Sequence, residues 1–283
     1  MRSGRTGQLA AALEVHQQQG HRGRGHAGNA TGLTDRGRTL GGELVTHLVR
    51  QPRDLGVVDI RRDRLLLLLD RAGDLVALPV NVAGVLGLDL APERADRLID
   101  YLELLARWNR AYNLTAVRDP EAMVTRHLLD SLAVLPHLPA CPRLLDIGSG
   151  PGIPGMILGV CRPDSEVTLV DSNLKMTRFA ATARRELRLA NVSVCRERVE
   201  QLDPVARFDC LISRAFASLA DFVRLGAPLL ADGGRMYAMK GRLNDDEIAA
   251  LPEGFVVSRR HALDVPDLDA ERHLLVVERA GPA

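Results

Sequence analysis

Residues 144–155 read Leu-Leu-Asp-Ile-Gly-Ser-Gly-Pro-Gly-Ile-Pro-Gly, an apolar run that passes directly into four glycines within eight positions. Such a run is typical of a buried strand that turns into a helix, because residues without a Cβ let the chain turn tightly and approach a ligand closely. We therefore predict a strand at residues 143–147. The loop that follows it is the expected ligand-binding turn of an α/β sheet.

Strands and helices alternate after this stretch. Helical segments are predicted at 173–189 and 219–230. Six further segments have the length and apolar content of strands, at 166–171, 192–196, 208–213, 235–240, 254–258 and 273–278. Seven strands with helices between them predict an α/β fold with a seven-stranded, doubly wound, Rossmann-like sheet.

Two helices are expected before the sheet. Pro92 and Glu93 suit the first turn of a helix, and apolar residues then recur at helical spacing as far as Trp108. A second helix is expected after Asp119 and Pro120, with apolar residues and a histidine near one face. These helices form an N-terminal helical part of the domain.

The N-terminal stretch differs in composition from the rest. Residues 1–64 hold 11 Lys+Arg against 6 Asp+Glu, a net charge of +5, which leaves about −4 for the remainder. The beginning of this stretch is rich in Gly, Arg, His and Gln without apolar periodicity, so we expect no packed core there. We predict a disordered extension at residues 1–79, either an RNA-binding arm or a segment without function. The folded domain is predicted at 80–283, with its helical part at 90–138.

Composition limits the class of protein. The chain has 283 residues, 46% of them hydrophobic, and can bury a full core. Its longest apolar run, 65–69, is far shorter than the roughly 18 residues of a membrane span, and the polar, basic N-terminus does not resemble a signal peptide. We therefore expect a cytoplasmic protein.

The four cysteines lie far apart in the sequence, with no CxxC pair and no histidine at metal-ligand spacing. They are Cys141, Cys161, Cys195 and Cys210. We expect reduced and mostly packed thiols, and neither a disulfide nor a metal site.

The glycine loop matches the GxGxxG pattern of dinucleotide-binding turns at residues 150–155, which is a weak indication by itself. Pro151 and Pro154 stiffen the turn, and neither has an N–H to offer a pyrophosphate. Asp171 ends the second predicted strand, where an acid accepts hydrogen bonds from the ribose hydroxyls of an adenosine. Dinucleotide and S-adenosylmethionine sites both use such an acid. The structural alternative is that Asp171 caps the next helix.

Six motifs extend this interpretation: 108–120 (WNRAYNLTAVRDP), 126–131 (RHLLDS), 145–155 (LDIGSGPGIPG), 212–218 (ISRAFAS), 238–241 (AMKG) and 269–274 (DAERHL). Together they resemble the class I S-adenosylmethionine-dependent methyltransferases, and more narrowly the bacterial ribosomal small-subunit methyltransferase G family, also called glucose-inhibited division protein B. The resemblance covers about residues 80–280. The absence of a counterpart for 1–79 favours an extension without function.

The resemblance implies methyl transfer from S-adenosylmethionine to N7 of a guanine in the 530 loop of 16S ribosomal RNA. Guanine N7 has an in-plane lone pair and no proton, so its attack on the sulfonium methyl needs no general base. Catalysis would then consist of holding N7 and the methyl carbon in line. We expect no catalytic acid–base pair, and we assign Cys210 to packing rather than to nucleophilic attack.

The resemblance also assigns cofactor-binding residues. The full set, with Asp171 included, is Gly148, Ile153, Asp171, Val199, Glu200 and Arg214. Val199 and Glu200 would approach the adenine. Arg214 would pair with the methionine carboxylate or with an RNA phosphate, and a plain surface arginine is the third alternative.

The residues expected to contact RNA are Arg126, His127, Lys240 and Arg272, with Arg178 and Arg242 as further candidates. The chain has only two lysines, Lys175 and Lys240, against 35 arginines. This composition suggests that an ammonium group, rather than a guanidinium group, is required at these two positions. The structural alternative to RNA contact is that Lys175 lies on a solvated helix face. For His127 it is that the side chain is hydrogen-bonded in the helix interior.

Several aromatic and neighbouring residues have two interpretations each. Phe216 would stack on the target base or pack in the core. Trp108, Tyr112 and Asn113 would organise the junction between helix and loop or approach the methyl-transfer pocket. For Trp108 we favour the structural role.

A mildly acidic domain is unusual for an RNA enzyme, because phosphate groups normally require a basic surface. We therefore expect a small contact area, a monomer, no membrane contact, and a better substrate in the assembled or partly assembled small subunit than in a short hairpin. Two other functions stay open: a non-catalytic adenosyl-binding ribosome-assembly factor, and a NAD-dependent oxidoreductase. The oxidoreductase is disfavoured because no hydride-transfer His or Tyr-x-x-x-Lys arrangement follows the loop.

Overall fold

The computed structural model describes residues 90–214, 216 and 218–281, together with three short strands earlier in the chain. These strands are β1 (Gly56–Asp59), β2 (Leu66–Leu69) and β3 (Leu75–Ala77), which pair antiparallel in the order β1-β2-β3. Apart from these strands, the extension predicted at 1–79 lies outside the described residues.

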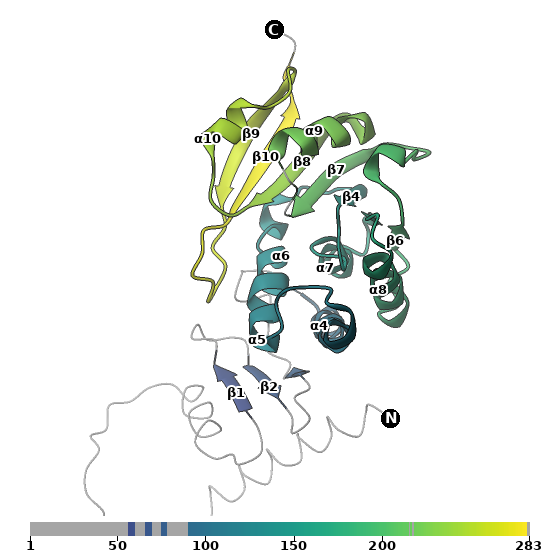
Figure 1. The fold of residues 1–283 in the computed structure, drawn as a ribbon, viewed down its shortest axis with the longest axis vertical. Coiled ribbons are helices and arrows are strands. Elements are labelled where there is room, and N and C mark those ends of the chain that lie inside the picture. Colours follow the sequence, from purple (N-terminus) through teal and green to yellow (C-terminus); the bar gives the residue numbers. More distant parts are fainter. Residues whose placement is uncertain are drawn as a thin grey trace, which may run out of the picture. The chain divides into compact units, whose positions relative to one another are not determined.

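The main sheet has seven strands in the order β6-β5-β4-β7-β8-β10-β9 (Figure 1). The five strands from β6 to β8 pair in parallel, and β10 is antiparallel to both of its neighbours. This arrangement confirms the predicted seven-stranded α/β sheet. The strands are β4 (Arg143–Ile147), β5 (Glu166–Val170), β6 (Val192–Cys195), β7 (Phe208–Arg214), β8 (Leu230–Lys240), β9 (Phe255–Ala262) and β10 (His273–Arg279).

Strand β8 begins five residues earlier than the sequence predicts. Its first half contains Gly233 and Gly234, which favour a turn in isolation. The strand nevertheless continues through them, and its pairing with β7 shifts register between Phe208 and Cys210. A bulge of this kind lets a strand absorb glycines that would otherwise end it.

The helical part before the sheet consists of α4 (Pro92–Tyr112) and a second helix that is not uniform. The second helix contains α5 (Pro120–Met123), a π-helical turn η1 (Val124–Leu129) and α6 (Asp130–Leu132). It starts where the sequence predicts, because the Asp119 carboxylate accepts a hydrogen bond from the Ala122 amide at 2.9 Å. The π turn was not predicted, and π turns often mark functional sites.

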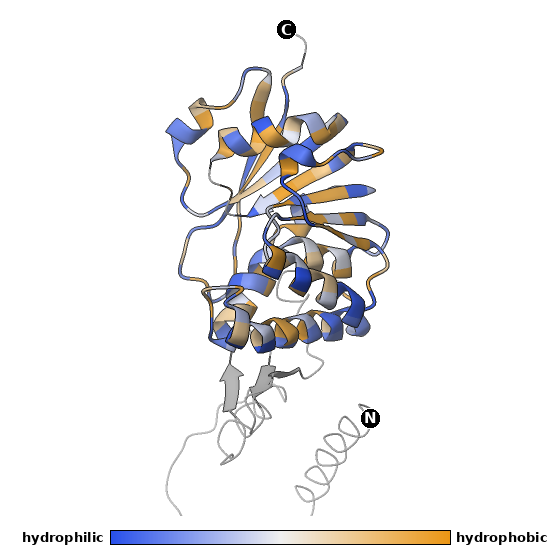
Figure 2. Ribbon diagram, turned by 45° about the vertical axis from the view of Figure 1, so that its right-hand side comes forward, coloured by the Kyte–Doolittle hydropathy of each residue, from blue (hydrophilic) through white to orange (hydrophobic). Residues whose placement is uncertain are grey.

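The remaining helices cover both faces of the sheet (Figure 1). One face carries α4, α7 (Gly155–Cys161) and α8 (Leu174–Glu186), and the other carries α9 (Leu219–Gly226) and α10 (Asp245–Ala249). Three short 3-10 turns join elements, η2 (Leu135–His137), η3 (Val199–Gln201) and η4 (Ala227–Leu229). The central strands are predominantly hydrophobic, and α4 alternates hydrophobic and hydrophilic residues along its length (Figure 2).

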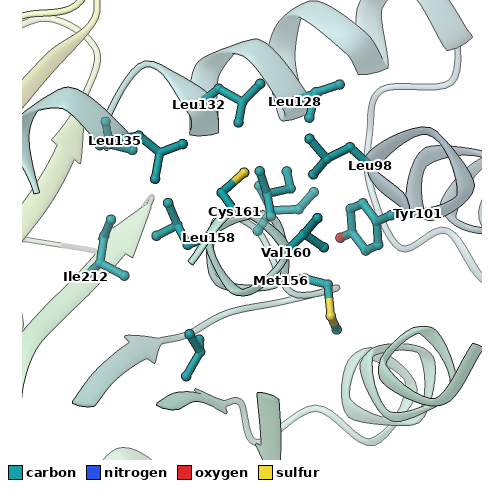
Figure 3. Packing of buried hydrophobic residues seen from close by; sticks show 14 of the residues in the cluster. Leu98, Tyr101, Leu128, Leu132, Leu135, Met156, Leu158, Val160, Cys161 and Ile212 are labelled. Atoms are coloured by element: carbon teal, nitrogen blue, oxygen red, sulfur yellow. The ribbon is translucent and has the colours of Figure 1, made fainter. Parts of the chain in front are cut away.

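Helix α7 is buried along its whole length and lies at the centre of the larger core. Leu98 and Tyr101 of α4 pack beside it, as do Leu128 and Leu132 of the second helix (Figure 3). All four of these side chains are fully buried. The N-terminal helices are therefore part of the same core as the sheet.

Cys141 and Cys210 are joined by a disulfide, so the prediction of four reduced cysteines was wrong for this pair. Cys141 lies two residues before β4, Cys210 lies in the adjacent strand β7, and their Cα atoms are 6.0 Å apart. Their sequence separation of 69 hides this proximity in the sequence. Cys161 and Cys195 are free thiols.

Within the described ranges, no helix is long and apolar enough to cross a membrane.

The start of α7 leaves no room for a side chain at its first residue, which gives a test of the packing. A Cβ on Gly155 would clash with the Leu169 side chain and lie 2.7 Å from Asp146 Oδ2. We expect Gly155→Ala to lower the free energy of unfolding by about 1–3 kcal/mol, as overpacking of a core does. Urea unfolding at neutral pH measures this, with Gly281→Ala as the control, since a Cβ there meets nothing within 4 Å. Equal stability of the two variants would contradict the expectation.

Candidate functional site

The carboxyl ends of the parallel strands bring most of the predicted site residues to one edge of the sheet. Gly148 follows β4, Asp171 follows β5, Arg214 ends β7 and Lys240 ends β8. The chain runs outward from β4 to β6 and then returns to β7 on the other side of β4. Ligands of open α/β sheets bind at such a reversal.

The glycine loop after β4 is built from left-handed backbone. Gly148, Gly150 and Gly152 have φ angles of +68°, +56° and +101°, values that residues with a Cβ rarely adopt. The amides of Gly148 and Ser149 donate to the Val170 carbonyl at 2.9 and 3.1 Å. The loop therefore folds over the end of the neighbouring strand β5.

The loop is also held from the helical side. Tyr101 of α4, which is fully buried, donates its hydroxyl proton to the Pro151 carbonyl at 3.0 Å. Burial raises the pKa of this tyrosine well above its usual value, so its hydroxyl stays protonated as a donor. Ile153, predicted as a cofactor residue, is 3% exposed and belongs to the core beneath the loop.

Asp146 is a site residue that the sequence prediction missed. Its carboxylate is fully buried, with Oδ2 accepting a hydrogen bond from the Gly155 amide at 2.8 Å. Oδ1 has no hydrogen-bond partner among the described residues. Burial raises the pKa of Asp146 to about 7, although the Gly155 bond and the Arg214 charge oppose the shift. An acid inside a short buried strand directly before glycines was the signal available in the sequence.

Asp171 joins the glycine loop to the start of α8. Oδ2 accepts from the Gly150 amide at 2.9 Å, and Oδ1 accepts from the Asn173 amide at 2.7 Å. The side chain that caps α8 is that of Asn173, which accepts from the Lys175 amide at 3.0 Å. A carboxylate has about four lone-pair positions, so Asp171 retains acceptor capacity for a ligand.

Val199 and Glu200 form part of the turn η3 that follows β6. Val199 is half-buried against the smaller core, and Glu200 is exposed. Both therefore follow the third strand along the same edge of the sheet, as the sequence predicts, and only Glu200 has its side chain in solvent.

Two arginines share one buried carboxylate beside this edge. Asp130 has a side chain that is 3% exposed, and it lies 3.4 Å from Arg214 Nη1 and 3.0 Å from Arg272 Nε. Arg214 Nη1 also donates to the Arg126 carbonyl at 2.8 Å. Asp130, from the motif RHLLDS, is a second residue that the prediction missed, and it fixes the positions of both arginines.

His127 lies within hydrogen-bond distance of the same arginine. Its Nδ1 is 3.5 Å from Arg214 Nη1, and its Nε2 is 2.9 Å from Thr115 Oγ1. Burial, and secondarily the Arg214 charge, lower the pKa of His127 to about 4. The imidazole is therefore neutral at physiological pH. The residue as a whole is 3% exposed.

The other residues predicted for RNA differ in their surroundings. Lys240 forms an ion pair with Glu247, whose carboxylate also accepts from the Leu219 amide at the start of α9. Arg126, Arg178 and Arg242 are exposed. Lys240 and Arg272 are therefore partly neutralised by the protein itself, whereas those three arginines present their side chains to solvent.

Phe216 and Trp108 both pack against other aromatic rings. The ring centroids of Phe216 and Phe222 are 5.8 Å apart, and those of Trp108 and Phe179 are 5.7 Å apart. The part of the chain that the structure describes contains no cluster of three His, Cys, Asp or Glu side chains suited to a metal ion.

Residues 94–275 match the family model described as "rRNA small subunit methyltransferase G". A protein named Ribosomal RNA small subunit methyltransferase G from Azoarcus sp. (strain BH72) is 53% identical over 194 residues, which cover 69% of this chain and 92% of that protein.

Relatives of the same name occur in two further organisms. The one from Burkholderia ambifaria (strain AMMD) is 52% identical over 204 residues, covering 69% of this chain and 90% of the relative. The one from Xanthomonas oryzae pv. oryzae (strain KACC10331) is 54% identical over 183 residues, covering 65% and 86%.

The neutral state of buried His127 predicts a pH dependence of stability. Its pKa is lowered from 6.5 to about 4 in the folded protein, so the unfolded chain binds the proton more readily. The stabilisation is therefore present above pH 6.5 and is lost as the pH falls from 6.5 to about 4, by at most about 3 kcal/mol. We expect urea unfolding to show a smaller decrease between pH 7 and pH 5 for His127→Gln than for the unmodified protein. An NMR titration of the His127 ring with a midpoint near 6.5 would contradict this.

Proposed function

This chain belongs to the rRNA small subunit methyltransferase G family, and from that premise we propose that it transfers a methyl group from S-adenosylmethionine to small-subunit ribosomal RNA. The proposed acceptor is N7 of a guanine in the 530 loop of 16S ribosomal RNA. The proposed substrate is the assembled or partly assembled small subunit, on which the protein acts as a monomer.

The observation that carries this proposal is the open space beside the glycine loop at the end of β4. A Cβ on Gly148 or Gly150 would meet no atom within 4 Å, so the space above these residues is open to a group that approaches the backbone. Asp171, with acceptor capacity to spare, follows the neighbouring strand, where it suits the ribose hydroxyls. Asp146 adds a buried oxygen that has no partner in the described part of the chain, which suits a cationic donor such as the ammonium group of the methionine part.

Bound S-adenosylmethionine supplies an electrophilic methyl group on a sulfonium. Guanine N7 offers a lone pair and no proton, so the protein has no proton to remove. The contribution of this chain is therefore to bind, align and exclude water, which holds the two reacting atoms at close distance. The neutral, hydrogen-bonded His127 fits a positioning role, since it supports Arg214 rather than accepting a proton.

Arg214 is the cation best placed to serve this reaction. The contacts described for its side chain all use Nη1, which leaves the Nε and Nη2 donors for an anion. The methionine carboxylate and an RNA phosphate are both such anions. Because Asp130 and the Arg126 carbonyl fix the guanidinium, the anion meets a preorganised partner.

Methyl transfer is tested with labelled S-adenosylmethionine and small subunits from a strain that lacks this gene. After digestion to nucleosides, we expect label in 7-methylguanosine. Gly148→Val should abolish transfer, because a β-branched residue is strained at φ +68° and fills the open space above the loop. Arg214→Ala should lower the rate at least about tenfold, the loss expected for a charge-assisted hydrogen bond. Cofactor binding without label transfer would indicate an adenosyl-binding assembly factor instead.

The role of Asp146 is tested through the pH dependence of cofactor binding. Its pKa is raised to about 7 in the free protein, so the carboxyl is protonated below that pH. If the ionised form binds the cofactor ammonium, affinity rises up to about tenfold per pH unit as the pH increases toward 7. Calorimetry between pH 5.5 and 7 should show this dependence for the unmodified protein and not for Asp146→Asn. The same pH profile in both proteins would exclude Asp146 from cofactor binding.

A further inference from the structure

Three aromatic rings run from the core of the protein to its surface. Phe179 of α8 is fully buried, and its centroid lies 5.7 Å from that of half-buried Trp108 on α4. The Trp108 centroid lies 5.2 Å from that of Tyr112, the last residue of α4. Tyr112 is 52% exposed. The outermost ring is therefore supported from below by packed rings and presents the rest of its surface to solvent.

The backbone beneath Tyr112 is fixed by polar contacts. Lys175 of α8 donates to the carbonyls of Tyr112 and Asn113 at 3.1 and 3.2 Å. Asn113 has a left-handed backbone with φ of +49°, and its side chain accepts from Arg118 at 3.1 Å. A cation at the C-terminus of a helix satisfies free carbonyls and interacts favourably with the helix dipole. An exposed aromatic residue that is held this firmly loses little conformational entropy when it binds a partner.

Exposed cations occur on the same two helices and in the turn after Tyr112. The segment 104–118 contains three arginines, at 107, 110 and 118, and is bounded by the acids Glu103 and Asp119. The helix α8 adds Lys175 and Arg178 and has no acid before Glu186. All five cationic residues are exposed. The local excess of positive charge contrasts with the net charge of about −4 that the chain carries beyond residue 64.

Helix α4 contacts the glycine loop, and α8 follows a residue that does so. Tyr101 of α4 bonds to the Pro151 carbonyl, and α8 begins three residues after Asp171. The aromatic and basic surface thus belongs to one helix that contacts the cofactor loop, α4, and to one that begins three residues after the loop-binding Asp171, α8. An RNA segment on this surface would be bound by the same rigid elements that position the cofactor.

We propose that Tyr112, with Arg107, Arg110, Arg118, Lys175 and Arg178 around it, is a docking platform for an unpaired RNA segment. One base stacks on the Tyr112 ring, and the flanking guanidinium and ammonium groups bind the phosphates. An unpaired segment suits this surface better than a duplex, because stacking requires an exposed base face, and aromatic side chains recognise bases in that way. This inference rests on the proposed function only in taking RNA as the substrate.

Kinetics on small ribosomal subunits test the platform with matched variants. Tyr112→Ala should raise KM for the subunit about 5- to 150-fold, the range for loss of one stacked base, and leave kcat at saturating substrate within a factor of about two. Tyr112→Phe keeps the ring and should behave like the unmodified protein. Val256→Ala removes an exposed apolar side chain on β9, far along the sheet from α4 and α8, and is the control. Equal thermal unfolding midpoints would show that the variants fold alike.

Direct binding measures the same surface without turnover. With a labelled single-stranded RNA oligonucleotide, Tyr112→Ala should weaken binding by a similar factor. Arg110→Gln and Arg178→Gln should each reduce the slope of log affinity against log salt by about 0.7, the value for one phosphate contact on a single strand. The affinity for a duplex RNA probe should change little in Tyr112→Ala.

The outcomes separate the platform from the enzymatic proposal. If the unmodified protein methylates subunits and Tyr112→Ala has an unchanged KM, the platform is wrong and the proposed function stands. If no RNA is methylated, the proposed function is wrong. Binding of the single-stranded oligonucleotide to the unmodified protein and to Tyr112→Ala then still shows whether the platform binds RNA. A loss of affinity in both Tyr112→Ala and Tyr112→Phe, or an equal loss on duplex RNA, would overturn base stacking.

Discussion

The buried carboxylate of Asp146 is the constraint on which the ligand-binding edge depends. It lies in the middle of the sheet, beside the point where the chain reverses, and one of its oxygens holds the first amide of α7. The loop between strand and helix has to close over this bond, so its glycines adopt left-handed backbone and Gly155 has no space for a side chain. Burial of an acid is costly unless its oxygens are paired. The second oxygen, which has no partner among the described residues, is the one assigned to the cofactor ammonium in the proposed function.

Carboxylates organise the rest of that edge as well. Asp171 links the loop to α8, Asp130 fixes two arginines, and Glu247 joins Lys240 to the start of α9. Asp130 connects residues 84 and 142 positions away, whereas Asp171 and Glu247 also bond residues close to them in the sequence. Charged hydrogen bonds of this type are stronger and more directional than neutral ones, so the edge is preorganised before a ligand binds. A reaction that needs alignment rather than proton transfer benefits from this rigidity.

The charge distribution also explains how a mildly acidic domain can recognise RNA. The cations near the strand ends are largely paired with protein acids, as Lys240 and Arg272 show. Exposed cations of α4 and α8 are the ones assigned to RNA in the platform proposed above. The net charge of the domain is therefore a poor guide to its binding surface, because electrostatic attraction to phosphates is governed by charges within about 8–10 Å at physiological salt.

The sequence by itself determined the elements and their order. Short apolar segments locate all seven strands of the main sheet, helical apolar spacing locates its main helices, and the glycines identify the ligand-binding turn, because these signals depend on neighbours only a few residues apart. The proximity of Cys141 to Cys210, the pairing of Asp130 with Arg272 across 142 residues and the capping of α4 by Lys175 were decided by the tertiary structure. The same holds for the free oxygen of Asp146 and the exposed ring of Tyr112. Burial and side-chain partners depend on which distant segments pack together, and local sequence patterns carry no direct record of that packing.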